Sequence, residues 1–209
     1  MKKLELSSFK KKNDFEFYKN YSNPCYSVVT PIDVTNLYRY ANEFSLSFYY
    51  CLIYLSIKAM ETVPEFTYRI REDGVYACEH IVPSFTDMKK GDTEYYIVTT
   101  RIIDEDIVAF NKKAKEVSLN QTVFCDDRNG FEEDEFAYIS CLPWFDFTSL
   151  VEEQQFSPNH SIPHLSWSKY TEVNGRKVLH YEILVNHRLI DGYRLGLFIN
   201  QLQKSIDNL

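Results

Sequence analysis

The residues best suited to chemistry lie near the C-terminus, in the segment VNHRLIDGYRLGLFIN at positions 185–200. His187 ends a strongly apolar strand pattern, and an Asp191-Gly192 pair comes four residues later. A histidine that leaves a sheet at the end of a strand is well placed for a cleft, and histidine side chains exchange protons with hydroxyls or thiols near neutral pH. Asp191 would then brace the turn that carries the histidine. The alternative is a structural histidine followed by an ordinary helix N-cap, and a short motif alone does not separate the two.

The elements that position His187 are a predicted hairpin and a predicted helix. Residues 164–187 have the pattern of two strands joined by an Asn174-Gly175 turn. Strand alternation places His187 on the same face as Val185 and its even-spaced neighbours. Asp191 is expected at the N-cap of the last helix. The apolar stripe of that helix consists of Leu195, Phe198, Ile199, Leu202 and Ile206.

The remaining chain interleaves helical and strand patterns. Helices are expected at 34–44, with Asp33 as the cap, at 47–63 and at 104–118. Residues 66–86 are expected to form two strands joined at Asp73-Gly74, and 135–147 resume strand character. This order predicts an α/β fold, a two-layer sandwich with a mostly antiparallel, mixed sheet covered by helices. Without repeats or linkers, residues 1–209 are expected to form a single domain.

Composition narrows the class of function. The chain has 209 residues, is 44% hydrophobic and 16% aromatic, and carries a net charge of −7. The negative charge argues against nucleic-acid binding. No signal peptide and no apolar run of about 20 residues is visible, which argues against a membrane protein. The 5 cysteines are widely spaced and lack metal-type spacing, so we expect a reduced, cytoplasmic protein without bound metal.

Several segments in one register resemble the chloramphenicol acetyltransferase family of CoA-dependent acyltransferases. The His-x-x-x-Asp-Gly motif at 187–192 is similar to the family signature, and ISCLPWFDFTS at 139–149 is similar to its SxxPW strand. FEFYKNYSNPCYS at 15–27, SFYYCLIYL at 47–55 and PEFTYRIREDGVY at 64–76 also resemble family segments. The resemblance covers nearly the whole chain.

The resemblance implies direct acetyl transfer from acetyl-CoA to an acceptor hydroxyl. His187 matches the family's general base, and Ser140 matches the serine that stabilises the oxyanion. Ser166 matches a threonine that assists through a water. Asp191 matches an aspartate that pairs with an N-terminal arginine, and the arginine position here is Lys11, which lacks the planar two-pronged geometry. No metal is implied.

The resemblance also implies binding residues and an assembly. Trp144, Lys169, Tyr170 and Tyr49 match positions along the CoA tunnel, where a family lysine is replaced by Ser47. Family members are homotrimers with active sites between subunits. The acceptor pocket, for chloramphenicol or a similar small hydroxyl compound, is matched by Tyr18, Cys25, Tyr26 and Leu150.

The acceptor pocket departs most from the family pattern. Leu150, Glu152 and Gln154 stand where chloramphenicol-binding members carry three apolar residues, and polar groups that face an apolar drug cost affinity unless they are paired. Two alternatives therefore stay open. One is a CoA-dependent acyltransferase with a more polar acceptor, and the other is a non-catalytic binding protein that kept the fold.

Overall fold

The computed structural model describes residues 1–5, 9, 11–102, 105–126, 130–153 and 157–209. Its main sheet has strand order β2-β10-β8-β7-β5-β6, and β9 pairs with β10. The strands are β2 (Cys25–Asp33), β5 (Val82–Met88), β6 (Tyr95–Thr99), β7 (Phe136–Leu142), β8 (His164–Ser168), β9 (Thr171–Val173) and β10 (Arg176–Asn186). The β5–β7 and β7–β8 pairs are parallel, and the remaining pairs are antiparallel.

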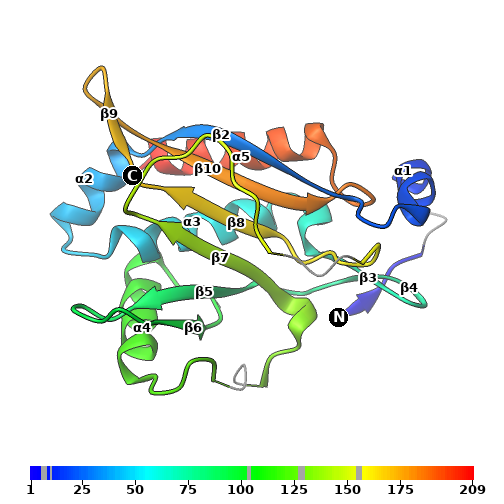
Figure 1. Ribbon diagram of the computed structural model, residues 1–209, viewed down its shortest axis with the longest axis horizontal. Coiled ribbons are helices and arrows are strands. Elements are labelled where there is room, and N and C mark those ends of the chain that lie inside the picture. Colours follow the sequence, from blue (N-terminus) through cyan, green and yellow to red (C-terminus); the bar gives the residue numbers. More distant parts are fainter. Residues whose placement is uncertain (6–8, 10, 103–104, 127–129, 154–156) are drawn as a thin grey trace.

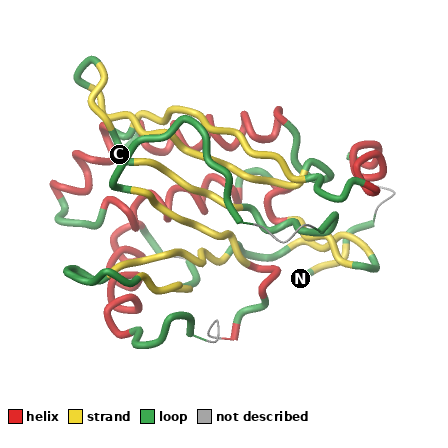
Figure 2. The backbone as a smooth tube through the Cα atoms, in the orientation of Figure 1, coloured by secondary structure: helices red, strands yellow, loops and turns green. Residues whose placement is uncertain are grey.

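Helices cover one face of this sheet. They are α2 (Thr35–Glu43), α3 (Phe48–Glu61), α4 (Ile107–Asn120) and α5 (Gly192–Asp207), and a short helix, α1 (Lys12–Phe17), lies beyond one end of the sheet. Figure 1 shows α3 and α5 behind the sheet, while the connection from β7 to β8 passes in front of it. Figure 2 shows the same division into a helical layer and a strand layer. The predicted mixed-sheet α/β sandwich is confirmed.

The core lies between the sheet and the helices. Trp167 on β8 stacks on Tyr181 of β10 with ring centroids 5.5 Å apart, and Tyr181 donates a hydrogen bond of 2.7 Å to Ser56 on α3. Phe198 on α5 packs against the same tyrosine. Nine residues of α3 are buried on several sides, which accounts for its nearly continuous apolar sequence. This core fixes β10, the strand that leads to His187.

Local sequence signals account for most element boundaries. Asn174 and Gly175 have φ angles of 51° and 76°, as a two-residue hairpin turn requires, and Asp191 caps α5 by accepting from the Arg194 amide. Asp33 is not the cap of α2, because β2 continues through it and Val34 precedes the helix. Its carboxylate nevertheless accepts from the Thr35 amide at 2.9 Å.

The segment at 66–86 holds three strands rather than two. β3 (Tyr68–Arg71) and β4 (Gly74–Ala77) form the expected hairpin, but they belong to a small sheet with β1 (Lys2–Lys3). The rest of the segment begins β5 of the main sheet. Within the described residues, no helix is long and apolar enough to cross a membrane.

Candidate functional site

His187 lies where β10 ends, held between two tyrosines. Its backbone amide donates to the Pro24 carbonyl at 2.9 Å. Its ring centroid is 4.5 Å from that of Tyr18 and 4.7 Å from that of Tyr26. The ring is half-buried, and its Nδ1 atom is buried without a hydrogen-bond partner among the described residues. Nε2 is therefore the nitrogen left to exchange a proton with a bound molecule.

The residues on both sides of His187 fasten it to its surroundings. Asn186 donates to the Pro158 carbonyl at 3.2 Å. Arg188, 2% exposed, donates to the carbonyls of Pro158 at 3.0 Å and Phe15 at 3.1 Å, and its guanidinium lies 4.0 Å from the Phe15 ring centre. Helix α1 and the loop before β8 are thus tied to the strand end that carries the histidine.

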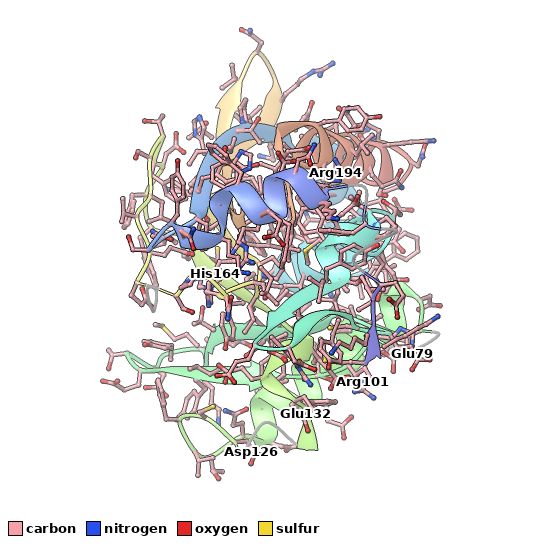
Figure 3. All side chains as sticks on the ribbon, turned by 90° about the vertical axis from the view of Figure 1, so that its right-hand side faces the viewer. Glu79, Arg101, Asp126, Glu132, His164 and Arg194 are labelled. Atoms are coloured by element: carbon pink, nitrogen blue, oxygen red, sulfur yellow. The ribbon has the colours of Figure 1, made fainter. Side chains whose placement is uncertain are left out.

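Asp191 anchors the turn that follows the histidine. Its carboxylate receives the Lys11 ammonium at 2.7 Å, the Arg194 guanidinium at 2.9 Å and the Arg194 amide at 2.9 Å. Burial alone would raise the pKa of Asp191, but the hydrogen bonds from Lys11 and Arg194 outweigh it and lower the pKa to about 2. Figure 3 shows Arg194 where α5 begins, close to α1. Lys11, itself buried, makes the ion pair expected of the family's arginine.

A row of polar side chains crosses the sheet on the face away from α3 and α5. Ser140 on β7 is the register partner of Ser166 on β8, which is the partner of Glu182 on β10. The Ser140 hydroxyl lies 3.5 Å from that of Thr86 on β5. Glu182 is fully buried and accepts from Ser27, and burial raises its pKa to about 8. Its Oε2 atom is buried without a hydrogen-bond partner among the described residues.

The loop before β8 adds a carboxylate and His160 to this row, and the first residue of β8 is a second histidine, His164. Ser166 donates its hydroxyl to Glu152, whose other carboxylate oxygen lies 3.3 Å from Nδ1 of His164. Nε2 of His164 lies 3.0 Å from Nε2 of His160. Burial and the neighbouring His164 lower the pKa of His160 to about 4, so the His160 ring is uncharged near neutral pH. Figure 3 shows His164 just below α1.

A cavity of about 1000 Å³ opens beside Ser140. Its walls include all four residues expected to bind CoA, together with Ser47 and the β5–β6 turn. Trp144 is 64% exposed, so its indole forms part of the rim. Aromatic faces and lysines suit an adenine ring and phosphate groups. The predicted lining residues are Tyr49, Ser140, Trp144, Lys169 and Tyr170.

The residues expected to bind the acceptor divide between two places. Tyr18, Cys25 and Tyr26 gather at His187, with Cys25 the register partner of Asn186. Leu150 is half-buried in the connection from β7 to β8. The predicted polar substitution at Gln154 lies outside the described residues.

His187 and Ser140 are not neighbours within one chain. Ser140 and Glu182 are separated by two strand spacings of ~4.8 Å, and His187 follows Glu182 by five residues at ~3.3 Å each. By ideal strand geometry the backbone positions of His187 and Ser140 are therefore about 19 Å apart. His187 is also absent from the described residues that line the cavity beside Ser140.

All five cysteines are unpaired. Cys141 lines the cavity, and burial raises the pKa of its thiol to about 12. Burial raises the pKa of Cys25 to about 11. Within the described residues, no group of three or more metal-type side chains is arranged to hold an ion.

Three features of the site are not among the residues predicted from the sequence. Arg188 is one of them. A charged residue directly after the histidine of an apolar strand indicates a buried side chain whose charge must be hydrogen-bonded. Glu182 is likewise a charged residue inside the apolar run of β10, which indicates a buried carboxyl group. The Lys89-Lys90-Gly91 turn between β5 and β6 also lines the cavity, and its Gly91 φ of 86° marks a tight turn.

Comparison with solved structures identifies the fold. A chloramphenicol acetyltransferase structure matches with a TM-score of 0.86 and 22% identity, over 97% of this chain and 98% of that one. A probable dihydrolipoamide acetyltransferase from Listeria monocytogenes matches with a TM-score of 0.64 and 17% identity, over 98% and 94%. At these identities the likeness shows the fold alone, an α/β sandwich shared with these acetyltransferase structures.

Sequence comparison identifies the family. Its profile, described as chloramphenicol acetyltransferase, matches residues 1–203. The chain is 26% identical over 206 residues to chloramphenicol acetyltransferase 3 of Escherichia coli, covering 97% of this chain and 95% of the relative. It is 28% identical over 205 residues to the Bacillus pumilus chloramphenicol acetyltransferase, covering 96% and 91%. The protein belongs to the chloramphenicol acetyltransferase family, and it is an acetyl-CoA-dependent O-acetyltransferase.

Proposed function

We propose that this transferase moves the acetyl group of acetyl-CoA to the hydroxyl of a small acceptor, chloramphenicol or a similar compound, in active sites shared between two subunits of a homotrimer. One observation carries the proposal. The histidine suited to deprotonate the acceptor is absent from the described lining of the cavity beside the serine, and strand spacings put the two backbone positions about 19 Å apart in one chain, too far to act on one acetyl group. Each must work with a group from a neighbouring subunit.

In this proposal His187 is the general base. Nε2 takes the proton of the acceptor hydroxyl as its oxygen attacks the thioester carbonyl, and a positioned base contributes typically ~10²–10⁴-fold. Tyr18 and Tyr26 hold the ring from two sides, so its direction is fixed before the acceptor binds. The new C–O bond replaces the C–S bond, and the proton passes to the CoA thiolate.

Ser140 is the proposed donor to the oxyanion. Its hydroxyl lies at the cavity wall, 3.5 Å from Thr86, so its hydrogen is free to turn toward a bound carbonyl oxygen. Ser166 differs, because its hydroxyl is already committed to Glu152. In this proposal Ser166 positions that carboxylate rather than the reacting atoms. The cavity residues Trp144, Lys169, Tyr170 and Tyr49 bind CoA, and Asp191 holds the turn that follows the base.

A closed ring explains the division of the site. When the surface around His187 of each chain faces the Ser140 cavity of the next, the contact is head-to-tail and a rotation closes it into a ring. The exposed aromatic side chains Phe17 and Tyr21, in contact with Tyr18, lie beside the histidine. Burial of these rings would supply apolar area to such an interface.

The test is acetyl-CoA turnover followed by release of free thiol, with chloramphenicol as acceptor. His187→Ala is expected to lower kcat at least about 10³-fold and Ser140→Ala about 10²-fold, both with the fold intact by circular dichroism. If His187→Ala keeps the activity of the parent enzyme, His187 is not the general base.

A mixing experiment tests the shared site. When the His187→Ala and Ser140→Ala chains are unfolded and refolded together, about a quarter of the sites should combine an intact histidine with an intact serine. Activity well above that of either variant alone is expected. Mixed chains as inactive as the separate variants would show that each subunit contains its whole site.

A further inference from the structure

We propose that the acceptor is a small alcohol that also carries a protonated amine, and that Glu152 binds this amine while the hydroxyl lies at Ser140. The inference rests on the proposed function and narrows its acceptor to one chemical class. Chloramphenicol, which carries no basic amine, is then the poorer acceptor.

The carboxylate lies one strand away from the reacting position. Ser140 and Ser166 are direct register partners, so their side chains share a face with ~4.8 Å between strands. Ser166 donates to Glu152, which places the carboxylate next to the row. The next residue, Glu153, lines the same cavity as Ser140. The segment that carries Glu152 therefore borders the space where the acceptor hydroxyl would lie.

The carboxylate lacks a permanent cation. Its one ion-pair contact among the described residues is the 3.3 Å approach to His164, which is in turn bonded to His160. No lysine or arginine of the described chain pairs with it. A carboxylate that is mostly buried and has no cation of its own is a place where a ligand cation gains an attraction that is screened in water.

A second carboxyl on the other side of Ser166 points to the same ligand. Glu182 is the register partner of Ser166, is fully buried, and has its Oε2 atom unpaired among the described residues. The Glu152 charge also raises the pKa of Glu182, so the two groups lie within electrostatic range. An ammonium group at Glu152 would offset this effect of the Glu152 charge on Glu182. An apolar group there would bury the Glu152 charge without compensation.

The spacing limits the size of the acceptor. One strand spacing separates the Ser140 and Ser166 positions, and hydrogen bonds reach ~2.8 Å on each side. A hydroxyl and an amine separated by about two or three carbon atoms fit this span. The bound amine is protonated and has no free lone pair, so it does not attack the thioester. The hydroxyl oxygen forms the new C–O bond as the C–S bond breaks, and the product is an ester.

The experiment compares matched acceptors in the parent enzyme, with thiol release as the measure. The acceptors are a 1,3-amino alcohol, the neutral alcohol with a methyl group in place of the amine, and chloramphenicol. We expect kcat/KM for the amino alcohol to exceed that for the neutral alcohol by at least about tenfold, because a charge-assisted hydrogen bond is involved. Equal values, or a preference for the neutral alcohol, would overturn the inference.

Two variants assign the effect to Glu152. Glu152→Gln should lower kcat/KM for the amino alcohol about 10- to 100-fold, mainly through KM, and leave the neutral alcohol within about twofold. Glu172→Gln, which removes the same charge from exposed strand β9, should leave the ratio unchanged. Equal losses for both alcohols would overturn the inference.

Sedimentation of Glu152→Gln distinguishes binding of the acceptor amine from a second role for the Glu152 carboxylate, an ion pair with the neighbouring subunit. A variant that dissociates, with an unchanged acceptor ratio, would show that Glu152 pairs with a cation of the partner subunit, which also overturns the inference. Failure of the proposed function has another signature, since then no alcohol, chloramphenicol included, is acetylated. Acetylation of chloramphenicol without the amino alcohol would refute this inference alone.

Discussion

Replacing Asp191 with asparagine removes the negative charge at the start of α5 but keeps an oxygen that caps the helix. The native carboxylate accepts from the Arg194 amide at 2.9 Å, and asparagine is an equally good N-cap. The substitution therefore separates the ion pairs with Lys11 at 2.7 Å and Arg194 at 2.9 Å from the cap. We expect the variant to fold and to be less stable.

The magnitude follows from the pKa of Asp191. A decrease from 3.8 to about 2 corresponds to ~2 kcal/mol of stability. The side chain is 28% exposed, so solvent screening reduces the expected loss to ~1–2 kcal/mol. For a chain of this length the melting temperature should fall by about 2–8 °C. Because the folded pKa is depressed, this stability is present above about pH 4 and is lost as the pH falls toward 2.

The assay is urea unfolding at one protomer concentration, at pH 7 and at steps between pH 4 and pH 2. The matched variants are Asp191→Asn, Lys11→Met and the double variant, which together form a thermodynamic cycle. A coupling free energy of about 1 kcal/mol or more is expected between the two sites. Independent effects of the two substitutions, or an unchanged acid transition in Asp191→Asn, would refute the reasoning.

Two further substitutions test the surroundings of the site. Arg188→Gln removes the bonds that tie α1 and the Pro158 loop to the strand end, and should lower kcat/KM for the acceptor about tenfold while KM for acetyl-CoA stays unchanged. Arg188→Lys should not restore it, because lysine lacks the planar fork, and restored activity would contradict this role. Glu182→Gln should stabilise the protein by ~4 kcal/mol at pH 8, because the raised pKa makes the parent lose stability as the pH rises from 4.5 toward 8. Parallel stability curves for Glu182→Gln and the parent between pH 5 and pH 8 would count against a neutral, buried Glu182.

The sequence predicts the parts of the fold that local chemistry determines. The Asn174-Gly175 turn requires positive φ angles that these residues adopt readily, and Asp191 caps the helix that follows it. The pairing of β2 with β10 joins residues about 150 positions apart, and no local signal encodes such a register. The small sheet of β1, β4 and β3 is a similar case.

The sequence predicts those parts of the candidate site in which the type of side chain implies its chemistry. It does not predict the parts that depend on contacts between distant segments of the chain. His187 was indicated by its place at a strand end, whereas Ser140 and the cavity residues were expected only from the resemblance to the family. The sequence does not decide whether Lys11 pairs with Asp191, because a lysine lacks the planar two-pronged geometry of arginine. In the structure Arg194 contributes a second cation to Asp191, so the turn is held from two sides. The contact between Glu152 and Ser166 depends on the course of the connection from β7 to β8, which sequence patterns do not specify.

The half-buried thiol of Cys141 has a consequence for the fidelity of the proposed reaction. This cavity is proposed to admit a thioester and to release a free thiol, and a thiolate on its wall would compete for the acetyl group or form a mixed disulfide with the product. A pKa of about 12 keeps Cys141 protonated throughout the physiological range, so neither side reaction has a nucleophile. Desolvation thus protects the enzyme from acylation by its own co-substrate.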